Sequence, residues 1–134
     1  MPLTVANLEK GHAFPPVTFE LSRDWVDQYS EAVSDSTIAT LGPGLVPPMA
    51  IAALSIRALL QHAALAPGTI HAGQEVSFSS ATHVGDTLSV TASVASRGER
   101  AGWVLMGVDL EALGPAGPVM TGRATITFPV DATN

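Results

Sequence analysis

Hydrophobic residues follow two different periods along the chain, helical in the first half and alternating in the second. Residues 24–33 carry apolar side chains at helical spacing, and almost every position of residues 49–62 is apolar or small. A helix that is apolar on nearly all sides is typical of a buried position. The hydroxyl of Ser22 can cap the first helix. Because proline is tolerated in a first helical turn, the second helix is expected to begin at Pro47-Pro48 and to end near Pro67-Gly68.

Strands are predicted where apolar and polar residues alternate. A short strand is expected at residues 17–21, and four longer ones after Gly68. The turns between the longer strands are expected at residues 83–86, 97–100 and 114–118. In the first of these strands, one face is expected to carry Ile70, Ala72, Val76 and Phe78. Because no helix separates the four strands, the pattern predicts one α+β domain over residues 1–134, with a curved antiparallel sheet wrapped around one long buried helix.

Composition narrows the classes of protein to consider. Hydrophobic residues make up 46% of the 134 residues and charged residues 13%, which excludes intrinsic disorder and favours self-association that hides apolar surface. The chain has no cysteine, so disulfides, thiol catalysis and thiolate metal sites are excluded. With a net charge of −6 and six isolated basic residues, nucleic-acid binding is not expected. Prolines and glycines interrupt the long uncharged run, and no signal peptide is recognised, so we expect a cytoplasmic protein without a membrane span.

Three segments carry a resemblance to a known family. They are Val46-Pro47-Pro48-Met49, the stretch from Ile70 through His71-Ala72-Gly73-Gln74-Glu75 to Phe78, and His83-Val84-Gly85-Asp86-Thr87-Leu88. Together they resemble the MaoC-like hydratase/dehydratase family, whose members have the hotdog fold. The likeness covers essentially the whole chain and is strongest to the non-catalytic subunits of heterodimeric acyl-thioester dehydratases. The resemblance implies addition of water across a 2-enoyl thioester, or its reversal, on acyl-CoA or acyl-carrier substrates, with no cofactor.

The residues that the resemblance assigns to catalysis are only partly present. Active family members use an Asp, a His five residues later, and a backbone N–H at the start of the buried helix. Asp35 stands at the position of the Asp, but Thr40 stands at that of the His. The family's His-Gly at the helix start corresponds to Pro47-Pro48, and proline has no N–H to donate. The N–H of Met49 is the remaining candidate to bind the thioester oxygen.

The effect on the reaction rate of losing the family's His and the helix N–H can be estimated. Losing a general acid or base costs roughly 10²–10⁴ in rate, and losing one oxyanion donor costs about 10²–10³. Both together would remove most of the family's activity. The absence of the family's His and Gly therefore favours a subunit that needs a catalytic partner, rather than an enzyme that is active alone.

Each further candidate residue has a functional and an ordinary interpretation. Asp35 could activate water or bond its own backbone in a turn. His71 could supply the missing imidazole from another direction, such as across a dimer interface, or simply face solvent. Thr40 and Ser55 could line an acyl tunnel or hold a water molecule, whereas a hydroxyl bonded to its own helix is the ordinary role for Ser55. The four histidines show no metal-ligand spacing, so no metal is expected.

Three functions remain open at this point. The chain could be an (R)-specific hydratase or dehydratase of acyl thioesters, with Asp35 as its base. It could be a non-catalytic subunit that pairs with a hotdog chain carrying the Asp–His pair, or a hotdog acyl-CoA thioesterase. All three share an acyl thioester as ligand. Because a lone hotdog domain leaves a strand edge unpaired, we also expect a homodimer or a heterodimer with another hotdog chain.

Overall fold

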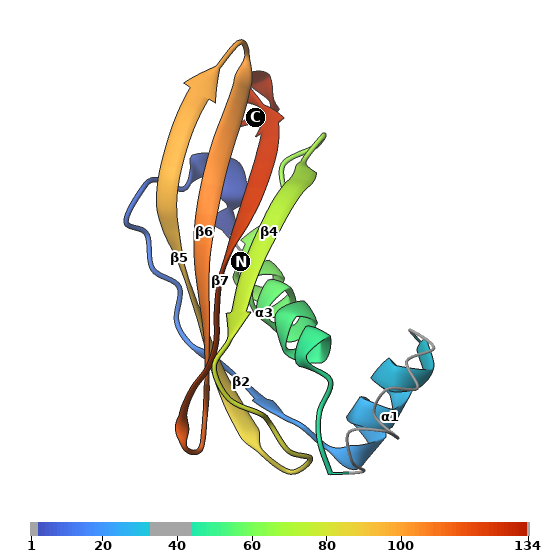
Figure 1. Ribbon diagram of the computed structural model, residues 1–134. Coiled ribbons are helices and arrows are strands. Elements are labelled where there is room, and N and C mark those ends of the chain that lie inside the picture. The colour runs from blue at the N-terminus through green and yellow to red at the C-terminus, as the bar shows by residue number, and fades with distance from the viewer. Residues whose placement is uncertain (1–2, 33–43, 134) are drawn as a thin grey trace.

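In the computed structural model, which describes residues 3–32 and 44–133, one long helix packs against a face of a curved sheet (Figure 1). The sheet has five strands in the order β2-β5-β6-β7-β4, and every neighbouring pair is antiparallel. The strands are β2 (Val17–Glu20), β4 (Ile70–Phe78), β5 (Thr87–Arg100), β6 (Trp103–Gly114) and β7 (Gly117–Pro129). The helices are α1 (Arg23–Ala32) and α3 (Pro48–His62). The predicted α+β class with a curved antiparallel sheet is confirmed.

Short elements complete the chain around this frame. Strands β1 (Leu3–Thr4) and β3 (Ala63–Ala64) form a small parallel pair of their own. The 3-10 helices η1 (Val5–Asn7) and η2 (Val130–Thr133) follow β1 and β7. No helix in the part of the chain that the structure describes is both long enough and apolar enough to cross a membrane.

Local sequence explains where the two helices begin. The N–H of Trp25 donates to Ser22 Oγ at 3.2 Å, which is the predicted cap of α1. Helix α3 begins at Pro48, with Pro47 as its N-cap, also as predicted. Its end differs from the prediction, because α3 stops at His62 rather than near residues 67–68. Residues 63–64 become extended to pair with β1, and the N–H of Ala63 caps the helix on Leu59 O.

The core lies between α3 and the sheet face that it covers. Helix α3 packs chiefly over β5, with smaller contacts to β6 and β7. The buried side chains of the helix are Ala50, Ile51, Ala52, Leu54, Ser55, Ala58 and Leu59. They meet the inward rows of the central strands, which include Val90, Val108, Leu110, Met120 and Phe128. This packing explains the apolar side chains on the covered side of α3, whereas the apolar residues Met49, Ala53 and Leu60 of the same helix are exposed.

The hairpin between β5 and β6 corrects a predicted turn. Residues 97–100 belong to β5, and Arg100 pairs with Trp103 across the hairpin. The turn itself is made by Ala101 and Gly102, with φ of 54° and 84°. Positive φ at both central residues is typical of the tight turns that match the twist of a hairpin. The prediction failed because Gly98 favoured a turn centred on residues 98 and 99, three residues before the observed one.

A bulge in β4 corrects the predicted faces of that strand. Ile70 pairs with Thr127 and His71 pairs with Ile126, but the next register pair joins Gly73 to Thr125. Ala72 is therefore an extra residue that breaks the alternation. Because directly paired residues point to the same side of a sheet, Ile70 lies on the opposite face from Val76 and Phe78. The same bulge places His71 on the face of the buried Ile126, toward α3.

Arg97 ties the N-terminal segment to the sheet. Its guanidinium donates to Ala6 O at 2.9 Å and to Leu8 O at 3.0 Å, and it lies over the ring of Phe128. We expect Arg97→Ala to lower the free energy of unfolding by about 2 kcal/mol, because two carbonyls lose a charged donor. Urea unfolding measures this, with the exposed Arg100→Ala as control. Equal stability of the two variants would contradict the anchoring role.

Candidate functional site

An apolar pocket of about 220 Å³ lies at the N-terminus of α3. It is formed by the start of the helix, the end of β4 and the segment that follows β4. Its lining residues are Leu45, Val46, Pro48, Ile51, Phe78, Ser80, Ala81, Thr82 and Val119. Backbone hydrogen bonds hold its walls together, from Val46 N–H to Thr82 O at 3.0 Å and from Val84 N–H to Gly44 O at 2.9 Å. The walls of the pocket are thus fixed by backbone contacts.

The first turn of α3 limits which amides this pocket can use. Pro48 occupies the first helical position and has no N–H. The N–H of Ala50 donates to Pro47 O at 3.0 Å. The N–H of Met49 is therefore the first amide that the helix can offer to a ligand, and it lies at the positive end of the helix dipole. The side chain of Met49 is 58% exposed, so it leaves this end of the helix accessible.

Thr82 gives the pocket a polar group that the sequence interpretation missed. The residue is only 3% exposed and lines the pocket, and its carbonyl accepts the hydrogen bond from Val46. Within residues 3–32 and 44–133, no hydrogen bond of its hydroxyl is found. The neighbouring hydroxyl of Ser80 is already engaged, since it donates to Pro118 O at 2.9 Å. A threonine beside an apolar pocket carries no pattern that sequence alone would single out.

The structure describes three of the five predicted site residues. Asp35 and Thr40 lie outside the described residues. Met49 lies at the start of α3, beside the pocket. Ser55 is fully buried, and its hydroxyl donates to Ile51 O at 2.9 Å. That bond is the ordinary one for a helical serine, and the role of Ser55 in substrate binding stays a prediction.

His71 lies apart from the pocket within one chain. It is exposed, near the start of β4, whereas Phe78, which lines the pocket, is the last residue of the strand. At about 3.3 Å per residue the two ends of the strand are roughly 20 Å apart. The structure therefore does not bring His71 and Met49 together in a single chain.

The other histidines have structural contacts. His62 Nε2 donates to Pro15 O at 2.9 Å, and its ring stacks on Phe14. His83 Nδ1 lies 3.8 Å from a carboxylate oxygen of Asp86, in the turn before β5. Among the described residues, no group of three or more His, Asp or Glu side chains is placed to hold a metal ion.

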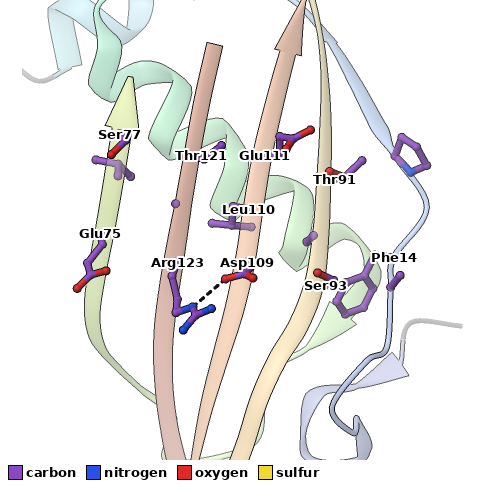
Figure 2. A pocket seen from close by; sticks show the side chains of 15 residues that line it. Phe14, Glu75, Ser77, Thr91, Ser93, Asp109, Leu110, Glu111, Thr121 and Arg123 are labelled. Carbon is purple, nitrogen blue, oxygen red and sulfur yellow. Dashed lines mark hydrogen bonds and ion pairs between the residues drawn. The ribbon is translucent and has the colours of Figure 1, made fainter. Parts of the chain in front are cut away.

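A second, wider depression of about 770 Å³ lies on the sheet face away from α3 (Figure 2). Figure 2 shows Arg123 of β7 turned toward Asp109 of β6, with Glu75 on the neighbouring strand. Arg123 Nε donates to Asp109 Oδ1 at 2.7 Å, and this bond, with the charges of Asp109 and Glu75, raises the pKa of Arg123. Both side chains of the pair are about half exposed. We favour the smaller pocket as the site because it is apolar and adjoins the start of a helix, whereas this face is open and polar.

Comparison with known proteins supports the fold at low sequence identity. No family model matches the chain, and no curated protein matches it. Among solved structures, the (R)-hydratase of A. caviae involved in PHA biosynthesis has a TM-score of 0.75 at 21% identity, covering 92% of this chain and 98% of that one. The HadBC complex of Mycobacterium tuberculosis, a 3R-hydroxyacyl-ACP dehydratase, also has a TM-score of 0.75, at 19% identity, covering 92% and 100%.

A third similar structure has a different activity. A mutant of the fluoroacetyl-CoA-specific thioesterase FlK has a TM-score of 0.70 at 17% identity, covering 93% of this chain and 91% of that one. A shared fold therefore leaves the reaction open. At the level of the fold the predicted resemblance is confirmed: the chain has the hotdog fold of the MaoC-like hydratases and dehydratases.

Proposed function

We propose that the chain binds an acyl thioester and acts as an (R)-specific 2-enoyl-thioester hydratase or 3-hydroxyacyl-thioester dehydratase. The observation that carries this proposal is the apolar pocket at the N-terminus of α3, beside the amide of Met49. Its volume of about 220 Å³ is below the 300–1,000 Å³ typical of pockets for drug-sized ligands. It suits the acyl end of the ligand, with the CoA or carrier protein outside.

The start of α3 is suited to the charge that develops during the reaction. Addition of water at C3 of a 2-enoyl thioester places negative charge on the thioester oxygen. An amide and the positive end of a helix dipole stabilise such an oxyanion. With Pro48 in the first helical position, the N–H of Met49 takes this role, and the hydroxyl of Thr82 is a further donor in the pocket wall.

Asp35 is the proposed base of the reaction. Its carboxylate takes a proton from water, the oxygen of the water bonds to C3, and a proton is delivered to C2. Dehydration is the same sequence in reverse. With Thr40 in place of the family's His, the proton for C2 comes from another group, and no cofactor takes part.

A partner-dependent subunit is the second candidate, favoured by Thr40 and by Pro48 in place of the family's His and Gly. In this case a hotdog chain with the Asp–His pair supplies the chemistry, and this chain binds part of the acyl group. The HadBC structure, described as a complex, supports an assembly of two such chains.

The deciding experiment is mass spectrometry of crotonyl-CoA, and of a longer 2-enoyl-CoA, after incubation with the purified chain. A gain of one water with CoA still attached is the expected result. Release of free CoA would instead establish a thioesterase. Two unchanged substrates would overturn independent catalysis and support the subunit that needs a partner.

Restoring the missing amide should raise the activity. We expect Pro48→Gly to increase the hydration rate of crotonyl-CoA by about 10–10²-fold, because one oxyanion donor is worth about 10²–10³ and the variant helix begins less rigidly. Pro67→Gly, in the exposed loop before β4, is the control. A rate for Pro48→Gly no higher than that of the control would show that the start of α3 does not contact the thioester oxygen.

A further inference from the structure

Exposed apolar side chains gather at one end of the sheet face that lies away from α3. Leu105 of β6 and Ile70 of β4 both pair with Thr127 of β7, so all three side chains share one face. Trp103 lies on the same face, two residues before Leu105, as does Asp109, four residues after it. Trp103, Leu105 and Ile70 are 42%, 55% and 53% exposed. Adjoining exposed apolar side chains of this size are typical of a surface that contacts another protein.

The remainder of this face carries an ion pair and small side chains. The half-exposed pair of Arg123 and Asp109 lies near the middle of β7 and β6, as Figure 2 shows. Between this pair and the apolar end, no side chain larger than that of threonine projects from the face. The residues paired across the four strands there are Ser96, Gly107, Thr125 and Gly73. A second sheet can therefore approach to the usual distance of about 10 Å without a steric clash.

We propose that a second copy of this chain packs on this face, around a two-fold axis that runs along the strands between β6 and β7 and passes the ion pair. In this arrangement β6 of one copy faces β7 of the other. Asp109 of each copy then lies against Arg123 of the second copy, so two carboxylates and two guanidinium groups alternate around the axis. Glu75 of β4 faces the neighbourhood of Ser93 on β5 of the second copy, a hydroxyl that can donate to it.

The same axis brings the two apolar ends together. Sheets that pack face to face cross at about 30°, and here they cross at the ion pairs. Because the axis runs along the strands, Trp103, Leu105 and Ile70 of both copies lie on the same side of this crossing point and meet there. Removal of these side chains from water favours association, and the charges fix the position of the axis. The outer face is thus complementary to itself in both charge and polarity.

Other two-fold axes on this face lack this complementarity. An axis along β6 would place Asp109 against its own copy, and an axis along β7 would do the same for Arg123, which is repulsive in both cases. An axis between β7 and β4 would leave Leu105 beyond the edge of the second copy, because β4 is the last strand. An axis across the strands would bring the apolar end of one copy toward Glu111 of the other and bury that carboxylate without a partner.

An exchange of the two charges tests the axis. Asp109→Arg leaves only guanidinium groups around it, and Arg123→Asp leaves only carboxylates. Each variant alone should have half the wild-type molecular mass by light scattering at about 10 µM, whatever other surfaces of the chain associate. A 1:1 mixture restores the alternation of charge and should recover the wild-type mass. The matched control is Asp27→Arg, which alters the exposed ion pair with Arg23 on α1 and should keep the wild-type mass.

Three outcomes of this experiment would overturn the proposal. They are a monomeric wild type, a single variant that keeps the wild-type mass, and a mixture that stays at half of it. Circular dichroism of each variant should match that of the wild type, so that a change in mass is not caused by unfolding. None of these measurements uses an acyl thioester, and their result is therefore independent of the proposed function.

Contact between the apolar ends has a separate optical readout. The chain has two tryptophans, so Trp25→Phe leaves Trp103 as the single one. In this background Asp109→Arg should move the tryptophan emission to longer wavelength and increase its quenching by acrylamide, because Trp103 becomes exposed to water. Addition of the Arg123→Asp variant, also carrying Trp25→Phe, should reverse both changes. Emission and quenching that do not change with the molecular mass would show that the apolar ends do not meet, and the proposed axis would be wrong.

Discussion

Asp35→Asn is expected to lower the rate of crotonyl-CoA hydration by about 10²–10⁴-fold, the usual cost of losing a general base. The amide has nearly the shape of the carboxylate but cannot accept a proton from water. The change should appear in kcat, measured by the loss of enoyl absorbance, because the acyl pocket and the amide of Met49 are untouched. Circular dichroism of both proteins should be the same.

The matched control is Glu31→Gln, which removes an exposed carboxylate near the end of α1. Its rate should stay within about a factor of two of the wild type. If Asp35→Asn behaves like this control while the wild type is active, Asp35 is not the base, and the ordinary role of Asp in a turn is the better account.

Gly122→Ala is expected to have the largest effect on stability. A Cβ at this position would lie 2.5 Å from the backbone oxygen of Glu75 and 3.2 Å from Val76 Cγ1, so β4 would have to move away from β7. Overpacking against backbone costs typically 1–3 kcal/mol and sometimes more, and we expect about 3 kcal/mol here. Urea unfolding would measure the loss.

Gly98→Ala is a suitable control for this effect. Gly98 also lies in a strand, β5, but a Cβ there would meet no atom within 4 Å. The control should unfold at nearly the same urea concentration as the wild type. If Gly122→Ala is as stable as Gly98→Ala, the close approach of β4 to β7 at this position is wrong.

Sequence periodicity was sufficient for the elements that bury one regular face. The predicted helix start at Pro47-Pro48 and the extent of the strand at residues 70–78 are confirmed, although the bulge at Ala72 interrupts the alternation of that strand and its predicted faces were wrong. The end of α3 was wrong because it is set by pairing between β3 and β1, a contact distant in sequence. The turn at residues 97–100 was wrong because these residues pair with β6, and the positive φ of the hairpin turn falls on Ala101 and Gly102 instead.

The candidate site was less predictable for a related reason. Met49 became a candidate because the resemblance marks the start of α3, and its role in binding stays a prediction. Thr82 was missed because burial of a single threonine beside a pocket leaves no periodic pattern. The side of the sheet on which His71 lies follows from the bulge at Ala72. The pattern of apolar and polar residues in this segment does not indicate that one residue is extra.

The bulge at Ala72 also has a consequence at the level of the gene. Loss of one in-frame codon would restore plain alternation to β4. That single deletion, of the Ala72 codon, would leave His71 opposite Ile126 and Ile70 opposite Thr127, on the faces that they occupy now, while every residue from Gly73 onward kept its place against β7. The histidine thus stays on its side of the sheet when the bulge residue is lost, whereas straightening the strand with Ala72 retained and paired to β7 would move it to the other side.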